Sequence, residues 1–115
     1  GDSEKQMKQL LSEYYSLGIS NWKATPKEFS AVAPNDGTFV AIWANLGTTN
    51  KALRAMTTSC TYGTNIVDAT DSILSGTGIH ILQGYVKSGE TITLTTSCEG
   101  DASTYYFYAG IFITE

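Results

Sequence analysis

The sequence predicts an all-β fold: an antiparallel β-sandwich or jelly roll of about eight strands, preceded by a short helix. Short runs rich in Val, Ile, Thr and aromatic residues recur along the chain, separated by residues that favour turns. The last run, 105–113, is apolar on both of the faces that alternate along a strand. A sandwich strand normally turns one face to the core and the other to water, so we expect a second copy of the chain to cover this strand. A central strand covered by its own loops is the alternative.

Length and charge limit the classes of function. At 115 residues the chain is one domain in size, with an expected N-terminal helix over 1–18 and a β-sandwich head over 19–115. The net charge is −4 and the 7 basic residues are scattered, so we expect no surface for nucleic acid. No apolar run approaches the roughly 20 residues of a membrane-spanning helix, so we expect no insertion into a membrane.

The first element is expected to be the short helix. Ser3 and Gln6 have the spacing of a capping box, and Gly18 is a natural stop. Between them, four apolar residues have the spacing of a coiled-coil seam: Met7, Leu10, Tyr14 and Leu17. Fewer than two heptads cannot hold a helix alone, so we expect the end of a coiled-coil stalk whose seam meets its symmetry mates. The alternative is an amphipathic helix that lies on the chain's own sheet.

The rest of the chain is expected to be β. Proline, glycine and asparagine mark turns at 34–37, 47–50, 75–78 and 87–90. The strands expected around these turns are 19–24, 29–32, 38–46, 52–60, 72–75, 79–86, 91–97 and 105–113. Residues 61–71 contain two glycine or asparagine breaks and two aspartates, so they are expected to be the least regular part.

Alternation along the strands assigns their faces. In 91–97, Ile92 and Leu94 are expected to face inward and the threonines outward. In 38–46 one face carries Phe39, Ala41 and Trp43. In the last strand, the residues expected to fill the sandwich are Phe107, Ile111 and Ile113. The residues expected to meet their symmetry copies near a threefold axis are Tyr106, Tyr108 and Phe112.

No catalytic or metal site is expected. His80 is the single histidine, so no second histidine is present to share a metal with it, and we expect a structural histidine with satisfied hydrogen bonds. Two carboxylate pairs, Asp68 with Asp71 and Glu99 with Asp101, fall among turn-forming residues, where aspartate usually bonds its own backbone. We therefore expect neither an enzyme nor a cofactor.

Two cysteines are present, and both end the tetrapeptide Thr-Thr-Ser-Cys, at Cys60 and Cys98. Two cysteines without CxxC spacing do not make a metal site. A disulfide between adjacent strands is one interpretation, and a pair of core-facing thiols is the one we favour.

Three segments, in this order, carry a resemblance to a known family. They are Ala33-Pro34-Asn35-Asp36-Gly37, Val86-Lys87-Ser88-Gly89-Glu90-Thr91-Ile92 and Phe107-Tyr108-Ala109-Gly110-Ile111-Phe112-Ile113. Together they resemble the heads of bacteriophage tail fibres and needles, which are trimeric jelly rolls of the tumour-necrosis-factor-like type. In that family the segments correspond to two turns that enter strands and to a last strand that lines the trimer axis. The resemblance covers 19–115 and supplies no fixed binding residues, because the receptor loops of the family vary.

The resemblance implies a homotrimer in a virion tail, outside the cell, whose head binds a protein or glycan receptor on a bacterial surface. One alternative is a purely structural knob that trimerises a fibre and ends it. Another is a sugar-binding module of a protein on the bacterial cell surface. All three readings are non-enzymatic.

Strand directions predict where a receptor would be contacted. If each connection reverses the chain from Gly18 onward, the loops far from the stalk are 25–27, 47–50, 75–78 and 98–103. Loops on a rigid frame commonly carry recognition. The candidate receptor-binding residues, chosen for hydrogen bonding and stacking, are Thr48, Thr49, Asn50, Glu99, Asp101 and Tyr105.

Overall fold

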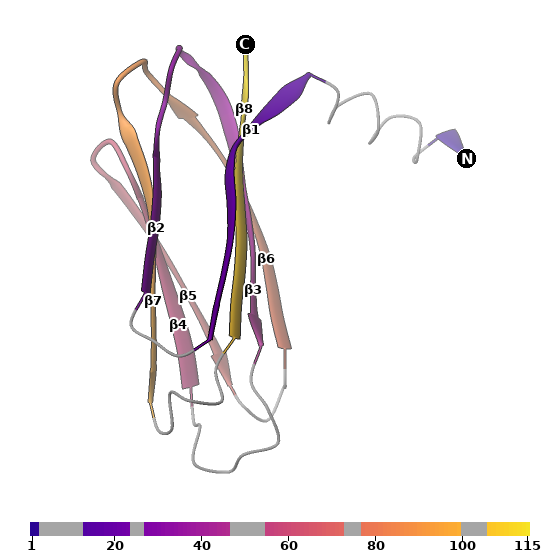
Figure 1. The fold of residues 1–115 in the computed structure, drawn as a ribbon, viewed down its shortest axis with the longest axis vertical. Coiled ribbons are helices and arrows are strands. Elements are labelled where there is room, and N and C mark those ends of the chain that lie inside the picture. Colours follow the sequence, from indigo (N-terminus) through magenta and orange to yellow (C-terminus); the bar gives the residue numbers. More distant parts are fainter. Residues whose placement is uncertain (3–12, 24–26, 47–54, 73–76, 100–105) are drawn as a thin grey trace.

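The computed structural model describes residues 1–2, 13–23, 27–46, 55–72, 77–99 and 106–115. These residues form eight strands (Figure 1). Their bounds are β1 (Tyr14–Lys23), β2 (Lys27–Val32), β3 (Gly37–Leu46), β4 (Ala55–Tyr62), β5 (Asn65–Ser72), β6 (Thr77–Val86), β7 (Thr91–Glu99) and β8 (Tyr106–Thr114). All regular secondary structure in residues 13–23, 27–46, 55–72, 77–99 and 106–115 is therefore β, as the sequence predicts.

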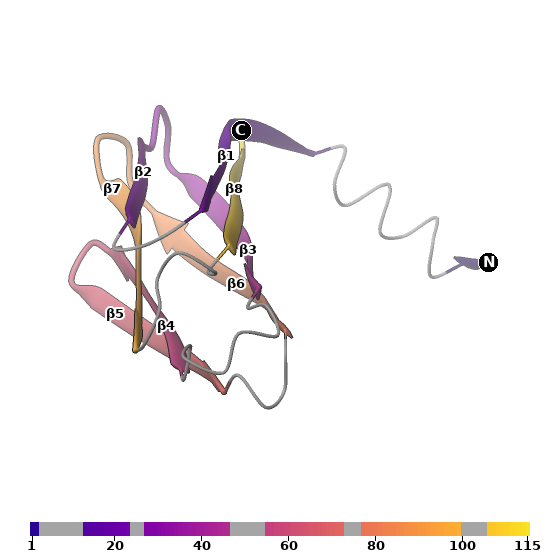
Figure 2. The same ribbon diagram turned by 60° about the horizontal axis from the view of Figure 1, so that its bottom comes forward.

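The strands form two four-stranded sheets, ordered β1-β8-β3-β6 and β2-β7-β4-β5. All neighbouring strands run antiparallel. Between consecutive described strands the chain changes sheet every time, except in the β4–β5 hairpin. Figure 2 shows the two sheets as separate layers, with β8 and β3 in the middle of one and β7 and β4 in the middle of the other. This is the double-sheet arrangement of a jelly roll.

The core lies between the sheets and follows the alternation read from the sequence. The fully buried side chains include the expected Phe39, Ile92, Leu94, Phe107, Ile111 and Ile113, each 0% exposed. The rings of Trp22 and Phe107 stack with centroids 5.1 Å apart, which attaches the edge strand β1 to the central strand β8. The inward faces expected for 38–46, 91–97 and the last strand are therefore confirmed.

The expected helix is wrong for its last residues. Strand β1 begins at Tyr14 and pairs with β8 as far as Lys23, so Tyr14 and Leu17 belong to a sheet and not to a helical seam. A bulge lies between Ser16 and Gly18, and Leu17 packs partly against the core of its own chain. Pairing with β8 provides hydrogen bonds for the backbone of β1 and buries apolar side chains. This stabilisation outweighs the weak helical preference that four apolar residues at heptad spacing can give. Met7 and Leu10 lie outside the described residues, so the stalk stays a prediction.

The segment expected to be irregular, 61–71, is mostly strand. A two-residue turn at Gly63 and Thr64 joins β4 to β5, with Gly63 in the left-handed region at φ 56°. Strand β5 then runs to Ser72, and the short strand expected at 72–75 lies almost entirely outside the described residues. Two aspartates lowered the strand propensity of this segment, but an edge strand tolerates such residues.

The two ends of the sandwich differ. At one end of the sandwich the odd-numbered strands finish and the even-numbered strands begin. We call this the distal end. The other end, the base, carries the turns 33–36, 63–64 and 87–90 together with the C-terminus (Figure 1). The strand directions expected from counting reversals along the chain are preserved, because β5 takes the place of the strand expected at 72–75.

The turns at the base bond one another. The Ala33 N–H donates to the Glu90 carbonyl at 2.8 Å, and the Gly89 N–H donates back to the Ala33 carbonyl at 2.8 Å. The Ser88 N–H donates to Asp36 Oδ1 at 2.7 Å. The turn before β3 and the turn before β7 are thus interlocked, as their common position at one end predicts.

The two cysteines are not joined to each other. Cys60 lies opposite Leu94 and Cys98 lies opposite Met56, so the two sulfurs occupy distant positions along the neighbouring strands β4 and β7. The thiol interpretation is confirmed. Burial raises the pKa of the Cys60 thiol to about 11, because the thiolate is poorly stabilised among apolar side chains.

Candidate functional site

The outward face of the β1-β8-β3-β6 sheet is mainly apolar, with apolar side chains on all four strands, and it is the candidate functional site. The strand register aligns Ile19, Gly110, Ile42 and Ile81 in one row across the sheet. The next row toward the distal end contains Asn21, Tyr108, Ala44 and Ile79, and the next row toward the base contains Ser16, Phe112, Val40 and Gln83. We call this surface the apolar face.

Large side chains on the apolar face are open to solvent in the single chain. Ile19, Ile79 and Ile81 are 76%, 70% and 71% exposed, and Tyr85 and Tyr108 are 60% and 43% exposed. Of the outward positions whose side chains the structure describes on these four strands, none carries a charge. Scattered exposed hydrophobic residues are ordinary, but a contiguous uncharged face marks an interaction surface.

The centre of the apolar face is hollowed at Gly110. The Phe112 ring lies over this residue, so that a Cβ at Gly110 would come within 2.9 Å of the ring. A shallow depression of about 340 Å³ surrounds it, with walls that include Ile19, Ile79 and Tyr108. A second hollow of about 230 Å³ adjoins it, between Asn21, Trp22, Tyr106 and Tyr108. The face therefore offers both protruding side chains and places to receive them.

The outward face of the other sheet has the opposite character. Its central strands β4 and β7 turn hydroxyl groups outward: Thr57, Ser59, Thr61, Thr91, Thr93, Thr95 and Ser97. Some of these are bonded, because the Ser59 hydroxyl donates to Asp68 Oδ1 and Thr57 Oγ1 lies 3.3 Å from Thr70 Oγ1. The centre of this face is therefore suited to water, although Val32 and Ile66 are exposed on its edge strands.

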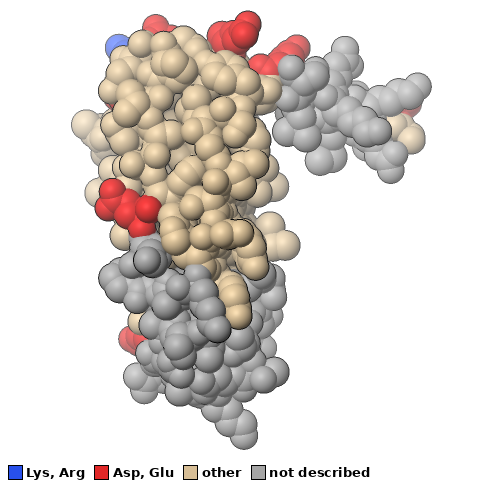
Figure 3. Space-filling view, viewed as in Figure 1, with Lys and Arg blue, Asp and Glu red and all other residues tan. Residues whose placement is uncertain are grey.

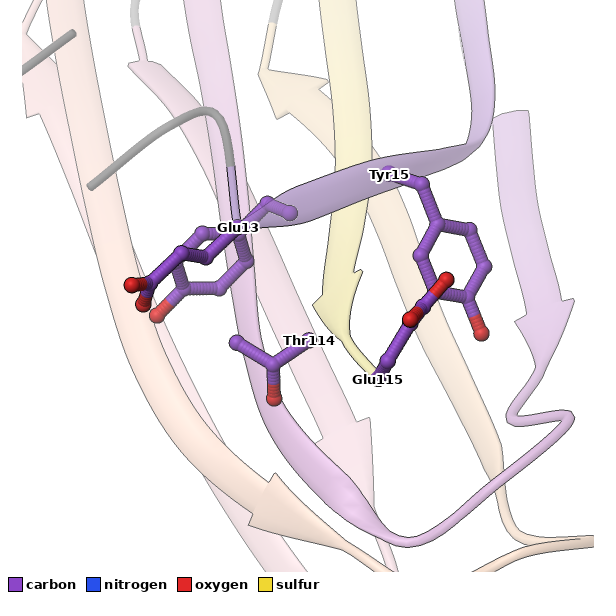
Figure 4. A pocket seen from close by; sticks show the side chains of 5 residues that line it. Glu13, Tyr15, Thr114 and Glu115 are labelled. Atoms are coloured by element: carbon purple, nitrogen blue, oxygen red, sulfur yellow. The ribbon is translucent and has the colours of Figure 1, made fainter. Parts of the chain in front are cut away.

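An acidic pocket lies at the base. It measures about 410 Å³ and is lined by Glu13, Tyr14, Tyr15, Thr114 and Glu115 (Figure 4). Figure 3 shows acidic side chains gathered at this end of the molecule, around the C-terminus. Within the described residues no group of three or more potential ligands is arranged to hold a metal ion, and no helix is long and apolar enough to cross a membrane.

The carboxylates of Asp68 and Asp71, one of the two pairs considered in the sequence, point to opposite sides of the sheet. Asp68 faces outward from β5 and is exposed, whereas Asp71 faces inward and bonds His80 Nε2 at 2.8 Å. The two carboxylates therefore lie on opposite faces of one strand. His80 has its hydrogen bond satisfied, as expected of a structural histidine. Asp101 lies outside the described residues, so its pairing with Glu99 stays untested.

The predicted site residues fall into two groups. Tyr106, Tyr108 and Phe112 lie together on the apolar face, and Glu99 is exposed at the distal end of β7. The remaining predicted receptor-binding residues lie outside the described residues: Thr48, Thr49, Asn50, Asp101 and Tyr105.

Sequence reasoning missed the contribution of β1 and β6 to the apolar face. The alternation that places His80 and Leu82 inward also places Ile79 and Ile81 outward, so the signal was present in the sequence. What was missing was the sheet order, which puts β6 beside β3 and makes the face continuous.

No family model matches the chain, and no curated protein sequence matches it. Solved structures are similar in fold. The PRD1 vertex protein P5 matches with a TM-score of 0.55 and 11% identity over 87% of this chain, which spans 63% of the length of that protein. A capsid chain of the Helicobacter pylori bacteriophage KHP30 matches with a TM-score of 0.54 and 11% identity, over 87% of this chain and 86% of that one.

A third similar structure is pika GITRL, with a TM-score of 0.50 and 11% identity over 85% of this chain and 97% of that one. At these identities the likeness shows the fold alone. The chain thus shares a jelly-roll fold with a vertex protein, a phage capsid chain and a ligand of the tumour-necrosis-factor-like type.

Proposed function

We propose that the chain is the trimeric, non-enzymatic head of a phage tail fibre or needle, and that it binds a receptor on a bacterial surface. One observation carries the assembly part of this proposal: the apolar face is continuous over four strands, holds large exposed side chains and has no charge at its described outward positions. Removing that apolar surface from water is favourable, roughly in proportion to its area.

The proposed occupant of the apolar face is another copy of the chain. The central strands of the second sheet turn hydroxyl groups outward, so covering the apolar face buries the larger apolar surface and leaves the more polar sheet in water. A cyclic trimer is a closed assembly, so no apolar face is left to which further copies could add without limit. The fold shared with phage capsid and vertex proteins supports a place in a virion, and the resemblance to tail-fibre heads favours the tail.

Replacing both Tyr108 and Phe112 with serine tests the assembly. The two side chains flank the hollow at Gly110, and burying an aromatic ring contributes about 1.5–3 kcal/mol through area alone. The doubly changed chain is expected to be monomeric or to aggregate, as measured by light scattering. A protein that keeps its original mass after this change contradicts the assignment.

The proposed receptor contacts lie at the distal end, with Thr48, Thr49, Asn50 and Asp101 supplying hydrogen bonds and Tyr105 a stacking surface. Glu99 is the described member of the set and is exposed there. In the sequence the other members of the set follow the ends of β3 and β7 or precede β8, and those strand ends lie opposite the interlocked turns of the base. Loops on a rigid frame commonly carry recognition.

Cell binding tests the receptor contacts. A variant with Thr49, Asn50 and Asp101 all changed to alanine is expected to lose binding to whole bacterial cells. A control with Thr64 and Lys87, which are exposed at the base, changed to alanine is expected to retain it. Retained binding in the first variant together with lost binding in the control contradicts the distal assignment. A trimer that binds no cells at all indicates a structural knob.

A further inference from the structure

Four polar side chains meet inside the sandwich near its distal end, one from each of four strands. His80 Nε2 of β6 lies 2.8 Å from Asp71 Oδ2 of β5, and the same carboxylate oxygen accepts a hydrogen bond from Asn45 Nδ2 of β3 at 2.8 Å. The Thr58 hydroxyl of β4 donates to Asn45 Oδ1 at 3.0 Å. We call Asn45, Thr58, Asp71 and His80 the polar cluster. Its bonds join β3 and β6 of one sheet to β4 and β5 of the other.

Two members of the polar cluster are fully buried and two are partly buried. Asn45 and Thr58 are 0% exposed, and the side chains of Asp71 and His80 are 11% and 27% exposed. Toward the base, the space between the sheets is filled by apolar side chains instead. A buried polar group without its partner is costly, so a bonded network of this kind holds one arrangement of its strands more strictly than an apolar contact would.

The surrounding residues are shaped to the polar cluster. A Cβ at Gly78 would lie 2.1 Å from Asp71 Oδ1, so only glycine at this position lets the carboxylate lie against the backbone of β6. The Trp43 ring stacks on the His80 ring with centroids 5.3 Å apart and an angle of 29° between the planes. Asp71 and His80 are therefore held from the sides as well as by their mutual hydrogen bond.

The polar cluster lies at the distal ends of β3, β5 and β6. Asn45 stands next to the last residue of β3, from which the chain continues into 47–54. Asp71 stands next to the last residue of β5, from which the chain continues into 73–76, and His80 is near the start of β6, where that segment returns. One carboxylate, that of Asp71, thus ties together three of the strand ends at which these segments begin or finish.

We propose that the polar cluster fixes the distal ends of β3, β5 and β6, and that Asp71 and His80 are positioning residues for recognition at the distal end. The part of the proposal that concerns recognition rests on the proposed function. The part that concerns the strand ends does not.

His80→Phe and Asp71→Leu are the test variants. His80→Phe keeps a ring on Trp43 and removes the hydrogen bond to Asp71, whereas Asp71→Leu removes both bonds to the carboxylate. His80→Gln retains an amide that can donate to Asp71 and serves as a rescue. Asp68→Leu is the matched control, because Asp68 lies on the same strand but faces outward and is exposed.

Hydrogen exchange of the backbone amides is the first measurement, since it reports local opening strand by strand. In His80→Phe and Asp71→Leu, amides at the distal ends of β3, β5 and β6 are expected to exchange about tenfold faster or more, because a hydrogen bond to a charged group is lost. Amides in the base turn 87–90 and the mass in solution should stay unchanged. Asp68→Leu and His80→Gln should exchange within about twofold of the unchanged protein.

Unchanged exchange at the distal strand ends overturns the proposal, and so does an equal rise at the base, because that would be a general loss of stability. Should Asp71→Leu fail to fold, His80→Phe decides the outcome.

Binding to whole cells is the second measurement, with the same variants at equal trimer concentration. It is expected to fall about tenfold or more in His80→Phe and to stay unchanged in Asp68→Leu. Faster distal exchange with undiminished binding refutes the role in recognition. If the unchanged protein binds no cells, the proposed function fails, while the exchange pattern alone still decides whether the polar cluster holds the strand ends.

Discussion

Replacing both Ile79 and Ile81 with serine removes the most protruding part of the apolar face on β6. The two side chains are 70% and 71% exposed in the single chain. Fully burying an isoleucine contributes about 1.5–3 kcal/mol, so covering the exposed parts of both contributes about 2–4 kcal/mol per copy. Over the three copies of a trimer this amounts to about 6–12 kcal/mol, or a loss of about four orders of magnitude or more in association.

Sedimentation velocity across a wide range of protein concentration measures this loss. The double variant is expected to sediment as a monomer at concentrations where the unchanged chain is assembled. Its own unfolding free energy, measured with urea on the monomer, should change by no more than about 0.5 kcal/mol per site, because both positions are on the surface.

Ile66→Ser is the matched control for this experiment. Ile66 is 68% exposed and lies on β5, on the outward face of the other sheet. Its replacement removes the same kind of surface and is expected to leave the mass unchanged. The reasoning is refuted if the Ile79 and Ile81 double variant keeps the original mass, or if Ile66→Ser dissociates the assembly as readily.

Two further predictions concern the core. Gly84→Ala is expected to cost about 1–3 kcal/mol in urea unfolding of the single chain, because its Cβ would lie 2.6 Å from the Phe39 ring. Gln83→Ala, on the outward side of the same strand, should be near neutral in that measurement, and equal effects would contradict the packing. Thiol titration at pH 8 should label Cys98 well before Cys60, since burial raises the pKa of Cys60 from 9.0 to about 11. The unfolded chain loses the Cys60 proton at lower pH than the folded chain, so folding stability should decline as pH rises from about 9 toward 11; a rise in stability would contradict this. Reductant should leave the melting temperature unchanged, and a lower melting temperature in reductant would indicate a disulfide.

The sequence predicts the strands whose apolar pattern agrees with their surroundings. In β7 and β8, alternation alone assigns Ile92, Leu94, Phe107 and Ile111 to the core, and all four are fully buried. The two-faced character of β8 also predicts that this side of the sandwich lacks a cover. These inferences succeed because side-chain direction in a strand is a local property.

Elements decided by distant partners were not predictable in the same way. Tyr14 and Leu17 have helical spacing with earlier residues, yet pairing with β8 places them in a strand. Asp68 and Asp71 lower the strand propensity of β5, but each finds a bonding partner supplied by another strand.

The polar cluster shows the limit most clearly. Asp71 is 26 residues from Asn45 and 9 from His80, and nothing in their spacing indicates that the three meet. Only the sheet order, which places β3 beside β6 and β5 across from both, brings their side chains to one point. The apolar face is a similar case, because its rows are made by the register of four strands.

The mass of the unchanged chain in solution, measured by light scattering coupled to size-exclusion chromatography, tests the central claim most directly. A single chain has a mass of 12.4 kDa. The account predicts three times that value, stable on dilution, because the apolar face is covered by other copies. A monodisperse species with the mass of one chain, its apolar face open to water, would contradict it.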